Sequence, residues 1–254
     1  MKENRYDDQE FFEKYSHMSR SEKGLAGAGE WPVLQAMLPD FTQKQVLDLG
    51  CGYGWHCRYA MERGAASVLG IDLSEKMLDQ AQKINQPAGV EYLRCALEDY
   101  AYPAETYDIV ISSLTLHYIE DLSALFRKVA QTLRTDGEFI FSMEHPIFTA
   151  EGSQQWLEQT SAGNPVWPVT RYFLDGRRDS IFLGAPVVKY HHSLTTIVQA
   201  LLSTGFELED IQEPQPTAEL IREVPQMEEE LHRPMMIIFK AKKHIFLHHG
   251  SVDM

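Results

Sequence analysis

The sequence of 254 residues has little cysteine and no long hydrophobic run, and both absences narrow its class. Its three cysteines, Cys51, Cys57 and Cys95, show none of the paired spacings typical of metal ligands. So few thiols favour a reducing cytoplasm over a disulfide-stabilised secreted fold. No apolar run approaches the roughly 20 residues that a membrane helix needs, and the polar residues 1–8 do not resemble a signal peptide. We therefore expect a cytoplasmic protein with no membrane partner.

Basic residues are also scarce. Lysine and arginine together number 23 against 37 aspartates and glutamates, which gives a net charge of −14. Such a surface repels the phosphate backbone of nucleic acids, so no nucleic-acid partner is expected. The hydrophobic content of 44% is ordinary for a globular domain. These values favour a small-molecule substrate.

A glycine-rich turn follows the first apolar strand of the sequence. The strand is predicted at residues 45–49, and glycines stand at alternate positions after it, at Gly50, Gly52 and Gly54. Glycine lacks a Cβ atom, so its backbone can approach a ligand closely. In open α/β sheets such a turn lies at the carboxyl edge of the strand, where cofactors bind.

Two kinds of cofactor compete for this turn. A dinucleotide site needs a third glycine at the position that Trp55 occupies, and the bulky indole would crowd the contact between helix and strand. The observed spacing, preceded by Asp48, resembles the first motif of class I S-adenosylmethionine-dependent methyltransferases. In that family the acidic residue and the loop hold the methionine end of the cofactor. The resemblance implies this role for Asp48, Gly50, Cys51, Gly52 and Gly54. A tight turn without a ligand is the remaining alternative.

Short apolar strands then alternate with amphipathic helices, which is typical of a parallel sheet covered on both faces. The predicted strands are 45–49, 67–71, 90–94, 107–112, 137–143, 206–211 and 235–241, and the predicted helices are 7–18, 30–38, 55–63, 74–83, 121–134, 194–203 and 217–232. We therefore predict an α/β fold, a Rossmann-like, seven-stranded, mostly parallel sheet. The resemblance implies that its last strand pair is antiparallel.

The chain divides into five predicted parts. They are N-terminal lid helices (1–40, with a flexible connector at 19–29), a cofactor-binding core (41–145), a cap insertion (146–192), the C-terminal part of the core (193–241) and a tail (242–254). The Asp175-Gly176 dipeptide suits the tight turn of a hairpin within the insertion. No metal site is expected, since the tail histidines His244, His248 and His249 have no carboxylate or cysteine beside them.

Further cofactor-binding residues are expected where the next strands end. Asp72 is placed to accept hydrogen bonds from both ribose hydroxyls, with capping of the following helix as the alternative, although Ser74 is itself a good N-cap. The resemblance places Leu73 and Met77 near the adenine. Many members of the family have an aspartate where this chain has Ala96, so either the backbone of Ala96 and Leu97 or the Glu98 carboxylate reads the adenine. The alternative for Glu98 is a solvated helix residue. The resemblance also places Ser112 and Ser113 beneath the sulfonium.

The substrate side is expected to contain a lid and two histidines. His117 and His145 follow strands at the same edge of the sheet, so either is a candidate general base if the acceptor must lose a proton. The sequence favours His145 over His117, because Glu144 adjoins it and Pro146 restricts its backbone to an extended shape. The alternative for each is a histidine hydrogen-bonded within its own loop. Aromatic and apolar side chains are expected to close over the site and exclude water. They are Tyr15, Met18, Trp31, Trp156, Trp167 and Tyr172. For Tyr15 and Trp31, packing in the core is the alternative.

The sequence thus predicts a methyltransferase that uses S-adenosylmethionine, releases S-adenosylhomocysteine and methylates oxygen or nitrogen of a small metabolite. The overall resemblance is to the small-molecule branch related to the ubiquinone and menaquinone biosynthesis methyltransferases. The segments 30–32 (Glu-Trp-Pro) and 144–148 (Glu-His-Pro-Ile-Phe) resemble an uncharacterised bacterial subgroup. The alternative function is a non-catalytic protein that binds the cofactor in a regulatory or assembly role.

Overall fold

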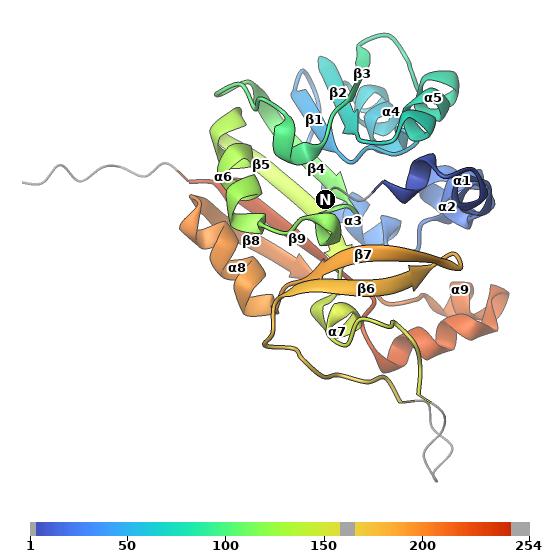
Figure 1. Ribbon diagram of the computed structural model, residues 1–254. Coiled ribbons are helices and arrows are strands. Elements are labelled where there is room, and N and C mark those ends of the chain that lie inside the picture. Colours follow the sequence, from blue (N-terminus) through green and yellow to red (C-terminus); the bar gives the residue numbers. More distant parts are fainter. Residues whose placement is uncertain (1–3, 158–165, 245–254) are drawn as a thin grey trace, which may run out of the picture.

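The computed structural model describes residues 4–157 and 166–244, which fold around a central seven-stranded sheet (Figure 1). Its strands lie in the order β3-β2-β1-β4-β5-β9-β8. They are β1 (Gln45–Leu49), β2 (Ser67–Asp72), β3 (Val90–Arg94), β4 (Tyr107–Ser113), β5 (Leu133–Glu144), β8 (Phe206–Gln212) and β9 (Met236–Lys243). Strands β1 to β5 pair in parallel, whereas β9 is antiparallel to both β5 and β8. The predicted Rossmann-like sheet with an antiparallel last pair is confirmed.

Helices cover both faces of this sheet. The helical elements before the insertion are η1 (Arg5–Asp7), α1 (Gln9–Ser16), α2 (Ser19–Glu22), η2 (Gly24–Gly27), α3 (Trp31–Met37), α4 (Trp55–Glu62), α5 (Glu75–Ile84), η3 (Leu97–Asp99), η4 (Leu116–Tyr118) and α6 (Leu122–Thr132). Those that follow are α7 (Pro146–Thr149), α8 (Leu194–Ser203), α9 (Ala218–Glu223) and η5 (Pro225–His232). Side chains of α6 and α8 form the core on one face, and those of α3, α4 and α5 form the core on the other.

Strand β1 is buried from both sides, which explains its nearly continuous apolar sequence. Successive side chains of a strand point to opposite faces. Accordingly Val46 packs into the core beneath α3 and α4, while Leu47 and Leu49 pack into the core beneath α6 and α8. This central position fixes the glycine turn that follows β1 at the middle of the sheet edge.

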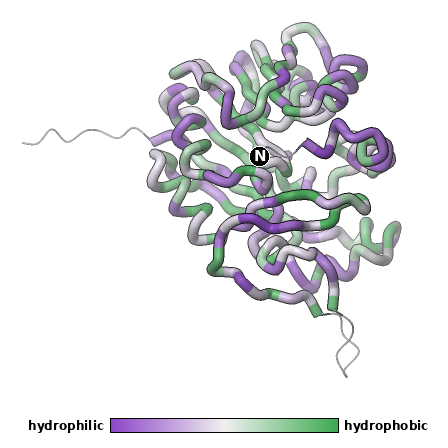
Figure 2. Tube along the Cα trace, in the orientation of Figure 1, coloured by the Kyte–Doolittle hydropathy of each residue, from purple (hydrophilic) through white to green (hydrophobic). Residues whose placement is uncertain are grey.

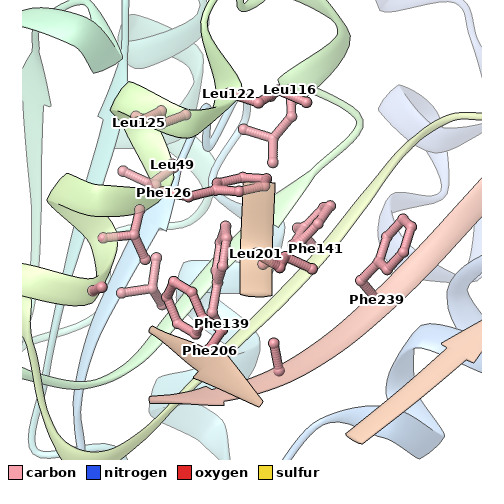
Figure 3. Close-up of a cluster of buried hydrophobic side chains, with 14 of the residues drawn as sticks. Leu49, Leu116, Leu122, Leu125, Phe126, Phe139, Phe141, Leu201, Phe206 and Phe239 are labelled. Carbon is pink, nitrogen blue, oxygen red and sulfur yellow. The ribbon is translucent and has the colours of Figure 1, made fainter. Parts of the chain in front are cut away.

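A cluster of phenylalanines joins the antiparallel pair to the parallel part of the sheet (Figure 3). Phe139 and Phe141 stand two residues apart on β5 and therefore share a face, with ring centroids 4.7 Å apart. The Phe239 ring of β9 stacks on Phe141 at 5.0 Å, and Phe206 of β8 contacts Phe139 at 5.7 Å. Since all four rings are buried, this packing holds β8 and β9 to β5.

The N-terminal segment is more ordered than the sequence predicts. Instead of a flexible connector, residues 19–29 contain α2 and η2, so that prediction was wrong. The reason is a close contact, because Gly24 has a positive φ of 62° and a Cβ atom there would lie 3.0 Å from the Trp55 indole. The glycine thus lets the segment pack against α4. Figure 2 shows that α1 and α2 are largely hydrophilic on the outside of the molecule.

The insertion contains α7 and a separate hairpin of β6 (Gly176–Phe182) and β7 (Ala185–His191), drawn in gold in Figure 1. Its turn was predicted at the wrong place. The chain turns at Leu183 and Gly184, which both have positive φ values, 52° and 78°. The Asp175 carboxylate instead accepts hydrogen bonds from Ser193 N at 2.9 Å and Thr196 Oγ1 at 2.5 Å, and so stabilises the start of α8.

Several other boundaries differ from the prediction. Strand β5 begins at Leu133 instead of 137, so the expected helix at 121–134 ends earlier, with α6 at Thr132. The expected helix at 217–232 is divided into α9 and η5, because Pro225 cannot continue the α-helical hydrogen bonds. Strand β9 continues past residue 241 to Lys243, and residues 245–254 of the expected tail lie outside the described residues. Within residues 4–157 and 166–244, no helix is both long and apolar enough to cross a membrane.

Candidate active site

The glycine turn after β1 exposes its backbone to a cavity. The Gly50 and Cys51 amides donate to the Ile71 carbonyl of β2 at 2.8 and 2.9 Å, which fixes the start of the turn. Gly52 has a φ of 52°, and a Cβ atom built there would meet nothing within 4 Å. Since Gly52 also lines the cavity, a ligand can approach its backbone closely.

The end of β2 places a carboxylate against this turn. Asp72 accepts hydrogen bonds from Gly52 N through Oδ2 at 2.9 Å and from Ser74 N through Oδ1 at 2.8 Å. Burial raises the pKa of Asp72 above its ordinary value, although both backbone hydrogen bonds act in the opposite direction. Ser74 caps α5 through its own hydroxyl, so the Asp72 carboxylate remains available to the cavity.

The cavity has a volume of about 240 Å³ and lies at the carboxyl edge of the parallel strands. It brings together most of the residues that the sequence predicts. On the cofactor side these are Gly50, Gly52, Asp72, Leu73 and Met77, together with Ala96, Leu97, Glu98 and Ser113. On the substrate side they are Tyr15, Met18 and His117.

Four residues predicted to bind the cofactor lie behind the cavity wall. These are Asp48, Cys51, Gly54 and Ser112. Ser112 donates to the Leu49 carbonyl at 2.8 Å, and a Cβ atom at Gly54 would lie 2.0 Å from the Tyr92 hydroxyl, so both residues serve packing. These four residues can therefore affect ligand binding only indirectly, by holding the glycine turn in position.

Asp48 is nearly fully buried beside a thiol. Cys57 Sγ donates to its Oδ2 at 3.2 Å, whereas Oδ1 has no hydrogen-bond partner among the described residues. Burial raises the pKa of Asp48 to about 7, although the hydrogen bond from Cys57 lowers it. The carboxylate is thus costly to keep ionised, and it faces the packing of α4 rather than the cavity.

Four of the expected lid residues do not line the cavity: Trp31, Trp156, Trp167 and Tyr172. Trp31 packs edge-on against Tyr59 of α4 at 4.8 Å. Trp167 stacks on Phe148 at 5.1 Å and donates to the Ile147 carbonyl at 3.0 Å. Tyr172 accepts a hydrogen bond from Leu194 N at 3.1 Å. These side chains support the elements around the site instead of covering it.

Trp156 and Trp167 contribute to a cluster around one guanidinium. The Arg233 side chain lies over the rings of Phe148, Trp156 and Trp167, at 4.5, 5.3 and 4.2 Å from their centroids. Cation–π contacts of this kind stabilise a desolvated arginine. Because Met235 lines the cavity two residues later, the cluster fixes the chain that enters β9.

The two candidate histidines have different surroundings. His117 is buried in the cavity wall, and the Glu144 amide donates to its Nδ1 at 3.4 Å. His145 does not line the cavity. Its Nδ1 accepts from Ile147 N at 3.0 Å, which begins α7, and its Nε2 lies 2.8 Å from Glu213 Oε1. The placement therefore favours His117 over His145, the opposite of the order favoured by the sequence.

A buried polar network joins the cap hairpin to the end of β5. Lys189 of β7 donates to Glu144 Oε1 at 2.6 Å and to Gln154 Oε1 at 2.9 Å. Gln154 Nε2 donates to the other carboxylate oxygen of Glu144 at 2.7 Å. Although burial acts to raise it, His117 and the Lys189 ammonium hold the pKa of Glu144 below its ordinary value. Glu144 itself lines the cavity, beside His117.

Sequence reasoning missed the lining residues supplied by distant parts of the chain. These are chiefly Asn4, Tyr6, Arg20, Tyr118, Phe182, Met235 and Met236. Arg20 pairs with the buried Glu30 at 3.0 Å, and the hydroxyls of Tyr6 and Tyr118 lie 3.1 Å apart. Leu114 was also missed, although its positive φ of 51° at the end of β4 marks a strained backbone at a site. The sequence offered one signal for two of the missed lining residues. Tyr118 is adjacent to His117 and Glu144 is adjacent to His145.

No group of three or more possible metal ligands occurs among the described residues. His248 and His249, considered in the sequence as possible ligands, lie outside the described part of the chain.

Comparisons with known proteins agree with this geometry. The methyltransferase domain family matches residues 47–141. An uncharacterised protein of Haemophilus influenzae is 34% identical over 251 residues, which cover 94% of this chain and 96% of that protein. A Listeria monocytogenes structure described as an S-adenosylmethionine-dependent methyltransferase has 49% identity and a TM-score of 0.81, covering 87% of this chain and 100% of that one. A Mesorhizobium loti methyltransferase structure has 44% identity and the same TM-score, with 86% and 100% covered.

The chain belongs to the class I S-adenosylmethionine-dependent methyltransferases. It is therefore an enzyme whose methyl donor is S-adenosylmethionine, and the alternatives of a dinucleotide site and of a turn without a ligand are set aside. The cavity fits this donor. The backbone of the turn is accessible to a ligand at Gly52, and the Asp72 carboxylate lies beside it. The Oδ1 atom of Asn4, which also lines the cavity, is buried and has no hydrogen-bond partner among the described residues.

Proposed function

We propose that the enzyme transfers the methyl group to an oxygen or nitrogen of a small metabolite, within the branch related to the quinone-biosynthesis methyltransferases. The observation that carries this proposal is the continuity of the cavity. It extends from Gly52 and Asp72 to His117 and Glu144, and both the N-terminal segment and the cap hairpin contribute to its wall. A concave site of about 240 Å³ suits a small acceptor better than a macromolecule.

We assign the cofactor contacts as follows. Asp72 accepts hydrogen bonds from the ribose hydroxyls, and Met77, Ala96 and Leu97 enclose the adenine. All four residues line one side of the cavity, and the three around the adenine are buried. Glu98 is exposed at the rim of the cavity, so its carboxylate can reach an exocyclic amine without being desolvated.

The methionine end belongs near the turn and the N-terminal segment. Gly50, Gly52 and Ser113 leave room for it, because two have no side chain and the third has a small one. Arg20 offers a cation to its carboxylate, since only the bond from Nη2 to Glu30 occupies the guanidinium among the described contacts. Tyr15 and Met18 then cover the sulfonium from the same segment.

Methyl transfer from a sulfonium needs little chemical assistance from the protein. It is an in-line displacement with a good leaving group, so most of the acceleration comes from holding the reacting atoms in line and close together. The residues opposite the cofactor side include Tyr118, Phe182 and Met236. They supply an apolar wall that excludes water from the reacting atoms.

The acidic charge and the free thiols support the remaining parts of the proposal. A net charge of −14 disfavours a nucleic-acid substrate. Cys51, Cys57 and Cys95 form no disulfide among the described residues, which favours the reducing cytoplasm.

The test is a transfer assay with tritium-labelled methyl donor and a bacterial metabolite extract, followed by separation of small molecules from protein and nucleic acid. We expect the label in the small-molecule fraction. The Asp72→Ala variant is the negative control and should give little label in that fraction. Label found only in precipitated protein or nucleic acid would contradict the proposal. Tight binding of S-adenosylhomocysteine with no transfer to any fraction would instead favour the non-catalytic role.

A further inference from the structure

The hydrogen bonds of the two histidines determine what they can do. The Glu144 amide donates to His117 Nδ1 at 3.4 Å, so this nitrogen uses its lone pair as an acceptor. A neutral imidazole carries one proton, which must then be on Nε2. Burial lowers the pKa of His117 to about 4, so the ring is neutral near pH 7. His117 is therefore a hydrogen-bond donor through Nε2 and has no free lone pair for a substrate proton.

Both ring nitrogens of His145 also lie against polar groups of the protein. Its Nδ1 accepts from Ile147 N, and its Nε2 faces Glu213 Oε1 at 2.8 Å. Because His145 does not line the cavity, neither histidine can act as a general base on a bound acceptor.

The other polar groups near His117 are also engaged. Both carboxylate oxygens of Glu144 accept hydrogen bonds, from Lys189 and Gln154. The hydroxyls of Tyr6 and Tyr118 are bonded to each other at 3.1 Å, and burial raises the pKa of Tyr6 well above its ordinary value. At this end of the cavity, no lining side chain that the structure describes is placed to remove a proton.

We infer that the methyl acceptor is a carboxylate oxygen of a small carboxylic acid, held by the Nε2–H group of His117. This inference rests on the proposed function and specifies its acceptor. A carboxylate is already ionised, so one oxygen can attack while the other accepts the hydrogen bond from His117. The new C–O bond forms as the C–S bond breaks, and the electron pair of that bond passes to sulfur. The carboxylate and the sulfonium become a neutral ester and a neutral thioether, and no proton is released.

The charges around His117 agree with an anionic acceptor. The ionised groups that act on this ring are the Glu144 carboxylate and two cations, Lys189 and Arg20. Glu144 is neutralised by Lys189, and Arg20 lines the cavity while it pairs with Glu30. An ammonium group of an amine acceptor would find no unpaired carboxylate beside His117, whereas a carboxylate finds the Nε2–H donor of His117.

The tautomer can be measured without any reaction. Nitrogen NMR of histidine-labelled protein, with the His117→Gln variant to assign the resonance, should show His117 neutral with its proton on Nε2. A proton on Nδ1, or a cationic ring at neutral pH, would overturn the inference.

The acceptor class is read from the product. With labelled methyl donor and panels of small carboxylic acids, phenols and amines, we expect transfer to acids and release of the label as volatile methanol in alkali, because esters hydrolyse while ethers and methylamines do not. Label that resists alkali would overturn the carboxylate while the small-molecule function stands. Absence of transfer to any small molecule, in the panels and in an extract, would end both proposals.

Two variants separate a donor from a base. Gln places an N–H group near the position of Nε2, whereas Leu has none. His117→Leu should lower kcat/KM by about 10- to 100-fold, the effect of losing a hydrogen bond to a charged group. His117→Gln should retain clearly more activity. Equal losses in both variants, with a wild-type rate that falls on acidification through the lowered pKa of His117, about 4, would show that His117 is a base.

Discussion

Asp72 is the residue whose replacement tests the cofactor site most directly. Asp72→Ala removes the charged acceptor assigned to the ribose, and each hydrogen bond to a charged group contributes about 1.5–3 kcal/mol. Calorimetric titration with S-adenosylhomocysteine should therefore show at least a 10-fold loss of affinity. Asp72→Asn, which keeps one acceptor oxygen for Gly52 or Ser74, should lose less. Wild-type affinity in folded Asp72→Ala would show that the ribose lies elsewhere.

Gly52 tests the open backbone of the turn. Gly52→Val places a branched side chain in space that is empty in the protein and that the cofactor needs. It also strains a backbone with a φ of 52°, at a cost of about 1–2 kcal/mol. Gly64→Val is the matched control, because Gly64 has a φ of 89° and is not among the residues that line the cavity. We expect both variants to lose stability, and only Gly52→Val to lose affinity for S-adenosylhomocysteine.

Asp48 makes stability depend on pH. Its folded-state pKa of about 7 lies above the value of an unfolded aspartate, about 3.9, so the folded protein retains this proton longer. The free energy of unfolding should therefore decrease as pH rises from about 4 to about 7 and then level off. Asp48→Asn keeps the acceptor for Cys57 without the charge. In urea denaturation it should gain stability relative to wild type between about pH 5 and pH 8. The same difference at both pH values would contradict this assignment.

Among the elements, strands were predicted better than the connections between them. Strand β1 and its parallel neighbours alternate with amphipathic helices, a pattern that the sequence displays directly. The hairpin turn at Leu183 and Gly184 was missed because leucine rarely adopts a positive φ, and Asp175-Gly176 offered a stronger turn signal. The Asp175 side chain is used at α8, a tertiary contact that no local pattern shows.

The site residues also divide into those that the sequence predicts and those that it does not. Residues at the carboxyl ends of parallel strands, such as Asp72 and Ser113, could be predicted because those ends meet at one edge. Arg20 and Met235 could not, because they reach the cavity only through the packing of segments far apart in sequence. The order of the two histidines depended on which loop faces the cavity, and this also is a tertiary property.

The cap hairpin is held to the sheet by a buried ion pair. Lys189 and Glu144 are both largely buried, so Lys189→Met leaves an uncompensated carboxylate and should cost about 3–5 kcal/mol in the free energy of unfolding. Adding Glu144→Gln should recover part of this loss. Lys240→Met is the control, since Lys240 pairs with Glu138 near the surface and should cost at most about 1 kcal/mol. Equal losses in denaturant titrations of the two lysine variants would show that the pair does not anchor the hairpin.

On the scale of the whole molecule, the cavity is completed by two segments that lie outside the central sheet. Asn4, Tyr6 and Arg20 come from the N-terminal segment, and Phe182 comes from the tip of the cap hairpin (Figure 1). Phe11 of α1 also contacts Phe182, with ring centroids 5.8 Å apart. The two segments therefore meet over the site, and a ligand beneath them should stabilise both.

Hydrogen exchange can test this coupling. We expect S-adenosylhomocysteine at 100 times its dissociation constant to raise the free energy of unfolding by about 2.7 kcal/mol. The amides of α1, α2 and the β6–β7 hairpin should exchange more slowly with the ligand, because the segments that carry them close the cavity. Helix α9 contributes no residue to the cavity lining. Its amides should exchange more slowly only where they exchange by global unfolding, which the ligand makes rarer. Protection confined to the glycine turn and β2 would show that the two segments do not respond to the cofactor, and that closure over the site requires the methyl acceptor.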